Sequence, residues 1–133
     1  MAIVGMGTDI VEIARIEEAL SRSSRLAPRV LTPTEMTLFE SSSEPVRYLA
    51  KRFAAKEAAV KALGTGIGRG IGWHHIEVSN DELGAPKLAF SDAFAQRCEA
   101  LGVTHSHISI SDEQHYATAT VILECLQPAG KEV

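Results

Sequence analysis

The sequence has few features of secreted, membrane or metal-cluster proteins. Its 133 residues include two cysteines, Cys98 and Cys125, which lie far apart and belong to no CxxC or Cys/His ligand spacing. A reducing cytoplasm is therefore the expected location. The N-terminal stretch lacks a basic region and a long apolar run, and no segment approaches the roughly 18 apolar residues of a membrane helix. We therefore expect a soluble, unprocessed protein without a membrane partner.

Basic residues and the common catalytic signatures are also scarce. Lys and Arg number 13 against 17 Asp and Glu, and the net charge of -4 argues against binding of nucleic acid by bulk attraction. The sequence has no GxSxG motif and no cysteine in a nucleophile context, so covalent acyl chemistry on the protein has no support. The histidines His74, His75, His105 and His107 do not combine with other ligands into a convincing zinc set.

The hydrophobic content, 45% of residues, is enough for one domain with a core. Hydrophobic periodicity and turn residues predict strands at 2–11, 73–79, 87–90, 105–111 and 116–124, and helices at 12–21, 32–40, 44–63 and 91–101. The TPTE sequence at 32–35 is a capping-box helix start, and Gly64 suits a left-handed cap at the end of the longest helix. This order indicates a small α+β domain with an antiparallel sheet packed against a long helix. We expect the domain to span 1–126 and a disordered tail to follow at 127–133.

A carboxylate lies in the apolar stripe of the longest predicted helix. At about 100° per residue, one stripe holds Val46, Leu49, Phe53 and Val60, and Glu57 falls between Phe53 and Val60. Glu57 is therefore predicted to point toward the core, where an ionised carboxylate needs a compensating cation or a raised pKa. An ion pair with Lys61, four residues later, is the alternative interpretation.

A second carboxylate lies in the first predicted strand. Asp9 shares one strand face with Gly5 and Gly7, which leave room for a close approach to the backbone. Asp9 could instead cap the helix that starts near Glu12. Together with Glu57, Asp9 makes a plausible Mg²⁺ site, because this ion prefers one or two carboxylates completed by water and phosphate oxygens.

A glycine-rich segment, GTGIGRG at 64–70, follows the longest helix. It has neither a Walker A ending nor a GxGxxG pattern, and a tight turn would explain its glycines. Lys61 before it, Arg69 within it, and Arg52 and Lys56 on the preceding turns indicate a positive strip beside a backbone that a ligand could approach closely.

The segment between Ala19 and Thr34 contains no acidic residue. Arg22, Arg25 and Arg29 lie in it, and Arg15 lies just upstream. If the segment is largely helical, these arginines form one basic face. The face is either an ordinary solvated helix surface or a docking site for an acidic protein partner.

Four segments resemble one known family. They are GTDIVEIARI at 7–16, RVLTPTE at 29–35, KRFAAKEAAVKALGTGIGRG at 51–70 and ISISDEQHYATATVILE at 108–124. Together they resemble the short, bacterial-type holo-acyl-carrier-protein synthases of the 4′-phosphopantetheinyl transferase superfamily. The FxxKEAxxKAxGTG string combined with the N-terminal GxD is highly specific for this family.

The resemblance implies a 4′-phosphopantetheinyl transferase-like fold and a homotrimer that binds coenzyme A (CoA) at subunit boundaries. The implied reaction moves 4′-phosphopantetheine from CoA to a serine of an acyl carrier protein in fatty acid biosynthesis and releases 3′,5′-ADP. A non-catalytic CoA-binding subunit and a structural oligomer are the competing interpretations.

The resemblance also implies roles for individual residues. Asp9 and Glu57 would hold Mg²⁺, Lys61 is the catalytic-site lysine, the loop at 64–68 would lie along CoA, and Arg15 and Arg25 would meet the carrier protein. From the mechanism we expect Glu57 to act as the base, directly or through a bound water. With the positive strip and the basic face added, the expected CoA contacts are Arg52, Lys56, Lys61, Gly64, Thr65 and Gly66, and the expected docking residues are Arg15, Arg22 and Arg25. Asp112 stands where some relatives have a histidine.

Overall fold

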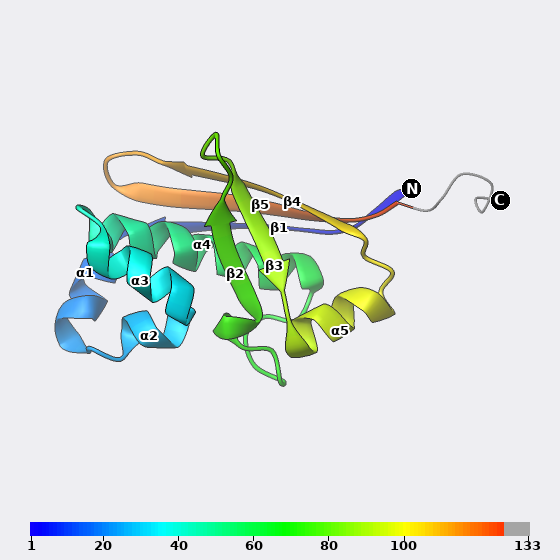
Figure 1. The fold of residues 1–133 in the computed structure, drawn as a ribbon, viewed down its shortest axis with the longest axis horizontal. Coiled ribbons are helices and arrows are strands. Elements are labelled where there is room, and N and C mark those ends of the chain that lie inside the picture. Colours follow the sequence, from blue (N-terminus) through cyan, green and yellow to red (C-terminus); the bar gives the residue numbers. More distant parts are fainter. Residues whose placement is uncertain (127–133) are drawn as a thin grey trace.

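The computed structural model describes residues 1–126, and Figure 1 shows how their helices and strands are arranged. The helices are α1 (Ile13–Arg22), α2 (Leu26–Val30), α3 (Pro33–Ser41), α4 (Pro45–Leu63) and α5 (Asp92–Ala100), and the strands are β1 (Ala2–Glu12), β2 (Ile76–Asn80), β3 (Pro86–Phe90), β4 (His105–Asp112) and β5 (Tyr116–Cys125). Within residues 1–126, no helix combines the length and apolar character needed to cross a membrane. The tail predicted at 127–133 lies outside the described residues, so its disorder stays a prediction.

The main sheet is antiparallel and has the order β1-β5-β4. Strand β5 is central, so Ala119 lies opposite both Asp9 of β1 and Ile110 of β4. Strands β2 and β3 form a separate antiparallel hairpin. The predicted α+β class with an antiparallel sheet and a long helix is confirmed. The strand predicted from Trp73 begins later, because Trp73–His75 form a short 3₁₀-helix.

The long helix α4 lies along one face of the three-stranded sheet (Figure 1) and ends at Gly64, whose φ of 85° is the predicted left-handed cap. It is buried on more than one side, largely through small residues: Ala50, Ala54, Ala55, Ala58, Ala59 and Ala62. The prediction that Glu57 points into the core is wrong, since Glu57 is only half-buried, like Val46 and Phe53. Leu49 and Val60 of the same stripe are fully buried, so Glu57 lies at the edge of the buried face, which the alanines extend around the helix.

Two glycines of β1 lie directly against the backbone of α4. A Cβ atom at Gly5 would lie 1.9 Å from the carbonyl oxygen of Ala62, and one at Gly7 would lie 2.1 Å from that of Ala58. Neither distance is compatible with a side chain. The close approach predicted at these glycines therefore exists, and its partner is a helix of the same chain.

A buried ion pair joins α3 and α4 to the β2–β3 hairpin. Glu35 is fully buried and forms the predicted capping box with Thr32, whose backbone N–H donates to Glu35 Oε1 at 2.8 Å. The backbone N–H of Val78 donates to Oε2 at 2.7 Å, and the ammonium of Lys56 donates to Oε1 at 2.6 Å. Buried charges are tolerated when they are paired and fully hydrogen-bonded, as these are.

The contact between β1 and α4 predicts that Gly7→Ala destabilises the fold by about 3 kcal/mol, because the added methyl group overlaps backbone atoms that cannot move alone. Urea unfolding measures the effect. Gly72→Ala is the matched control, since a Cβ at Gly72 meets its nearest atoms, in the His75 ring, at 3.9 Å. Equal stability of the two variants would contradict the interpretation.

Candidate active site

The close contact between β1 and α4 brings three charged side chains together. Asp9 follows Gly5 and Gly7 on the face of β1 that packs against the helix. Because β1 and α4 run in opposite directions at this contact, Asp9 lies beside the helical turn that carries Glu57 and Lys61. The sequence therefore predicted correctly that the two carboxylates approach each other.

Lys61 binds Asp9 and not Glu57. Its ammonium donates to Asp9 Oδ1 at 2.9 Å and to the carbonyl oxygen of Thr8 at 3.1 Å. The side chain of Asp9 is 14% exposed and that of Lys61 is 50% exposed, so the pair lies at the protein surface. The alternative ion pair between Glu57 and Lys61 is therefore absent from the described part of the chain.

Asp9 does not cap α1 either. The first amide of this helix, that of Ile13, donates to the carbonyl oxygen of His115 at 2.8 Å, and the helix has no side-chain cap. Asp9 therefore does not stabilise the start of α1.

Glu57 is the carboxylate without a partner. Among residues 1–126 it forms no hydrogen bond or ion pair, although it is half-buried. Burial raises the pKa of Glu57 above its usual value, the nearby Asp9 carboxylate raises it further, and Lys61 lowers it. A half-buried carboxylate with a raised pKa is a better proton acceptor than an ordinary surface carboxylate.

The donor set fits a hard divalent cation. No group of three or more His, Cys, Asp or Glu residues gathers within the described residues, so a cage made only of protein ligands is not available there. Mg²⁺ does not need one, because it binds one or two carboxylates and takes its other ligands from water and phosphate. Glu57 has both carboxylate oxygens unpaired, and Lys61 occupies only Oδ1 of Asp9.

The glycine loop directs its first amides back toward α4. The N–H groups of Gly64, Thr65 and Gly66 all approach the carbonyl oxygen of Val60, at 3.0, 3.2 and 3.4 Å. The loop glycines at 64, 66, 68 and 70 have positive φ angles, which supports the tight-turn interpretation of the sequence. A ligand would therefore meet the surface of this loop and not a cradle formed by its first three amides.

A cavity of about 460 Å³ adjoins the loop. Gly64 and Thr65 line it together with Arg69, and helix α5 contributes Gln96 and Arg97. No local pattern in the sequence links Arg97 to the glycine loop, because α5 is distant from the loop in the chain.

Lys56 has a structural role in place of the predicted ligand contact. The side chain is fully buried, and its ammonium donates to Glu35 Oε1 at 2.6 Å and to the carbonyl oxygens of Val30 at 2.7 Å and Trp73 at 3.2 Å. All three donors are therefore used inside the fold. Burial lowers the pKa of Lys56, and the hydrogen bond and charge of Glu35 oppose this shift.

Arg52 is also buried but keeps an unused donor. Its Nη2 atom donates to Asn80 Oδ1 at 3.0 Å, and the guanidinium lies 4.5 Å from the centre of the Tyr48 ring. Its Nε has no acceptor within the described residues. Arg52 lines a cavity of about 160 Å³ at the start of α4.

The predicted basic face is not continuous. Helix α1 ends at Arg22, Ser23 is extended, and α2 begins only at Leu26, so Arg25 does not share a helix with Arg15 or Arg22. The projection that put all of these arginines on one helix face is therefore wrong, because it assumed an unbroken helix.

The predicted docking arginines themselves are exposed. Arg15 lies 3.7 Å from Glu12, and Arg22 pairs with Glu18, with both arginine side chains more than three-quarters exposed. Arg25 is exposed as well. All three remain accessible to a partner.

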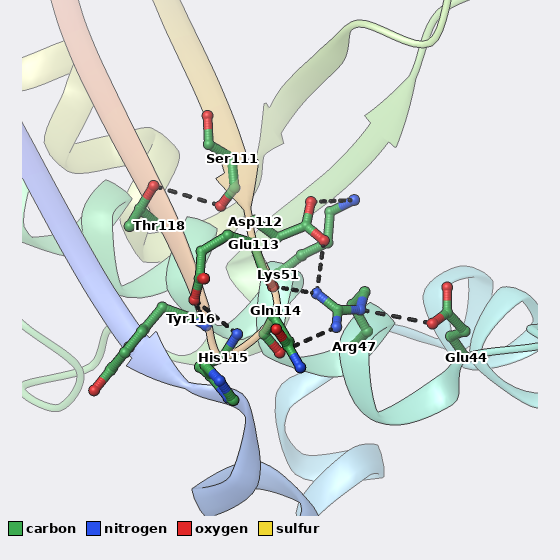
Figure 2. Close-up of polar contacts among 10 residues, drawn as sticks. All are labelled: Glu44, Arg47, Lys51, Ser111, Asp112, Glu113, Gln114, His115, Tyr116 and Thr118. Carbon is green, nitrogen blue, oxygen red and sulfur yellow. Dashed lines mark hydrogen bonds and ion pairs between the residues drawn. The ribbon is translucent and has the colours of Figure 1, made fainter.

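The structure also contains a polar cluster that sequence reasoning missed. Arg47 of α4 binds Asp112 and the turn between β4 and β5 (Figure 2). The two segments are distant in sequence, and no local pattern connects them.

Comparison with known proteins identifies related chains. A family model described as the 4′-phosphopantetheinyl transferase superfamily matches residues 5–121. A holo-[acyl-carrier-protein] synthase of Alteromonas mediterranea is 67% identical over 124 residues, covering 93% of this chain and 98% of the relative. The resemblance seen in the sequence motifs is therefore confirmed.

Two solved structures are similar over almost their whole length. The holo-[acyl-carrier-protein] synthase of Neisseria meningitidis has a TM-score of 0.87 and 40% identity, over 92% of this chain and 99% of the other. The enzyme of Bacillus anthracis in complex with CoA (3′,5′-ADP) has a TM-score of 0.78 and 39% identity, over 93% of this chain and 98% of the other.

The raised pKa of Glu57 predicts a stability difference that depends on pH. A carboxyl group whose pKa is higher in the folded state stabilises the fold below its unfolded pKa, and this contribution is lost as the pH rises through the folded pKa. Glu57→Gln removes the charge, so the variant should be more stable than the wild type at pH 7. The difference should shrink toward about pH 4, where the wild-type carboxyl group is largely protonated.

Thermal unfolding at the two pH values measures this difference. Asp9→Asn is the comparison, because it removes an ion pair with Lys61 and should not stabilise the fold at pH 7. A Glu57→Gln variant that is less stable than the wild type at pH 7 would contradict the assignment of Glu57 as an unpaired, strained carboxylate.

Proposed function

The chain belongs to the 4′-phosphopantetheinyl transferase superfamily, and we propose that it transfers 4′-phosphopantetheine from CoA to a serine of apo-acyl-carrier protein. The products are holo-carrier protein and 3′,5′-ADP. The observation that carries this proposal is the joint position of Asp9, Glu57 and Lys61 at the contact between β1 and α4. The Bacillus anthracis relative, which is described as a complex with CoA (3′,5′-ADP), supports CoA as the co-substrate.

Asp9 and Glu57 are proposed to hold Mg²⁺ through their unpaired oxygens. Mg²⁺ bound there would neutralise negative charge on the CoA diphosphate. The protein contributes the geometry, since Gly5 and Gly7 fix the distance between the strand and the helix that carry the two carboxylates.

Glu57 is the proposed base. Its carboxylate takes the proton of the carrier-protein serine, directly or through a bound water, and its raised pKa suits this role. The serine Oγ then forms a bond to the phosphorus of the phosphopantetheine group, and the bond from that phosphorus to the bridging oxygen breaks. The electron pair of the broken bond leaves with 3′,5′-ADP.

Lys61 is proposed to offset the charge on the departing 3′,5′-ADP. Its half-exposed ammonium is held at 2.9 Å from Asp9 Oδ1, so it is positioned before the substrate binds. Preorganised charges of this kind stabilise a transition state without rearrangement during the reaction.

The CoA contacts are proposed to come from Arg52, Lys61 and the surface formed by Gly64, Thr65 and Gly66. Arg52 has a donor without an acceptor among the described residues, and Gly64 and Thr65 line the cavity next to Arg69 and Arg97. Lys56 is not retained as a ligand contact, because its donors are used inside the fold.

The exposed arginines Arg15, Arg22 and Arg25 are proposed to dock the carrier protein. Arginine suits this role because its planar guanidinium binds carboxylates through two parallel hydrogen bonds. The net charge of -4 makes this local group of cations distinctive.

We also propose that the chain assembles as a homotrimer and works in the cytoplasm in fatty acid biosynthesis. The outer face of β1 supports self-association, because Ile3, Met6 and Ile10 are each about two-thirds exposed on the side of the sheet that faces away from α4. Exposed apolar patches of this kind are typical of protein interfaces.

The reaction itself is tested by incubating the protein with apo-carrier protein, CoA and Mg²⁺ and measuring the carrier-protein mass. We expect an increase of about 340 Da, the approximate mass of a phosphopantetheine group. Glu57→Gln and Asp9→Ala should remain folded and lose at least about a hundredfold in turnover. Omitting Mg²⁺ in the presence of a chelator should also suppress the increase.

The outcomes separate the competing functions. CoA binding by the wild type without any mass increase would favour a non-catalytic CoA-binding subunit. Absence of both binding and transfer would favour a structural oligomer. Wild-type rates in Glu57→Gln or Asp9→Ala would refute the proposed site.

The docking proposal predicts that Arg15→Glu or Arg25→Glu raises KM for the carrier protein by about tenfold and leaves KM for CoA nearly unchanged. Glu17→Gln on the same helix is the charge-change control and should have little effect on either constant. Equal effects of the arginine variants on both substrates would argue against a docking role.

A further inference from the structure

Arg47 binds the turn between β4 and β5 at several points. Its Nη1 atom donates to Asp112 Oδ2 at 2.9 Å and to the carbonyl oxygen of Glu113 at 2.7 Å, and its Nη2 atom donates to the carbonyl oxygen of Gln114 at 3.4 Å. Its Nε lies 3.7 Å from Glu44. Figure 2 shows the guanidinium between α4 and the turn, with Glu44 on its other side.

These contacts use most of the hydrogen-bonding capacity of Arg47. A guanidinium has five N–H donors, and three of them donate to acceptors of the turn, while Nε lies at ion-pair distance from Glu44. Only about a quarter of the side chain is exposed. The contacts to main-chain oxygens of the turn depend on the forked shape of the guanidinium, which a single ammonium does not have.

The turn that Arg47 holds also accepts a hydrogen bond from the first amide of α1. The backbone N–H of Ile13 donates to the carbonyl oxygen of His115 at 2.8 Å, while α1 has no side-chain cap and no acidic residue in its first turn. Within the turn, the carboxylate of Glu113 accepts from the backbone N–H groups of His115 and Tyr116, each at 2.7 Å. The turn around His115 is therefore held by Arg47 at the carbonyl oxygens of Glu113 and Gln114 and by the Glu113 carboxylate from within.

We propose that Arg47 is a positioning residue for carrier-protein docking. Arg47 fixes the turn at 113–115, and the turn fixes the first amide of α1, the helix that carries the proposed docking residues Arg15 and Arg22. The inference rests on the proposed function, because it takes α1 as part of the docking surface. Arg47 itself touches neither α1 nor the carboxylates of the site, so it acts through the turn.

A second interpretation is direct contact between Arg47 and an anionic ligand, since Arg47 lines the 160 Å³ cavity beside Arg52. The two hydrogen bonds of Nη1 argue against it, because a ligand that took over Nη1 would release Asp112 and Glu113. The two interpretations predict different kinetic changes, so the test measures KM for each substrate separately.

The test uses Arg47→Met, which keeps most of the aliphatic chain and removes every donor. Amide exchange measured by NMR should become about tenfold faster at Ile13, because its acceptor is no longer held. KM for the carrier protein should rise at least about threefold, while kcat and KM for CoA change little.

Lys51→Met is the matched control for amide exchange. Lys51 lies 3.5 Å from the same carboxylate, Asp112, but donates to no carbonyl oxygen of the turn. It should leave exchange at Ile13 as in the wild type. If Arg47→Met does not fold, Arg47→Lys takes its place, because it keeps a cation beside Asp112 without the fork that bridges Glu113 and Gln114.

Unchanged exchange at Ile13 in the Arg47 variant would overturn the inference, as would a rise in KM for CoA with no change for the carrier protein. A similar acceleration in Lys51→Met would overturn it as well, because loss of charge alone would then explain the effect. Failure of the proposed function would be recognised separately, since the wild type would then give no mass increase whatever the exchange data show.

Discussion

The backbone contact between β1 and α4 determines both the fold and the candidate site. Gly5 and Gly7 leave no space for a Cβ atom, so the strand lies directly on the carbonyl oxygens of the helix. The next inward-facing residue, Asp9, is thereby brought to the turn with Glu57 and Lys61. A larger residue at either glycine would separate the strand from the helix, and the two carboxylates with them. The same contact therefore determines both how β1 packs on α4 and where the carboxylates of the candidate site lie.

Three carboxylates on or beside α4 differ in how their charge is compensated. Glu35 is fully buried and accepts three hydrogen bonds, from two backbone amides and Lys56. Asp9 is paired with Lys61 at the surface. Glu57 has no partner among the described residues, and its pKa is raised. Burial by itself would have selected Glu35, whereas an unsatisfied charge makes Glu57 the candidate for the proposed catalytic role.

Local signals in the sequence were sufficient for most elements, because caps and periodicity are local, but they predicted neither the short helix α2 nor the 3₁₀-helix Trp73–His75. The capping box at Thr32 and the left-handed cap at Gly64 are present as predicted. The errors concern contacts between distant segments. No pattern near Lys56 reveals that its acceptors come from three other parts of the chain, and no pattern near Ser23 requires the helix to break there. The approach of Asp9 to α4 was predictable because Gly5, Gly7 and Asp9 alternate along one strand, whereas the buried position of Lys56 depends on tertiary partners.

The short path from β1 to α1 connects the candidate site with the proposed docking helix. Strand β1 ends at Glu12 and α1 begins at Ile13, so Asp9 and Arg15 are six residues apart on a backbone with no intervening loop. A carrier protein bound to α1 would therefore be placed relative to Asp9 by the geometry of a single junction. That junction has no side-chain cap of its own and depends on the carbonyl oxygen of His115. If α1 docks the carrier protein as proposed, a small displacement of the β4–β5 turn would change docking while the contact between β1 and α4, and the carboxylates it holds together, stays intact.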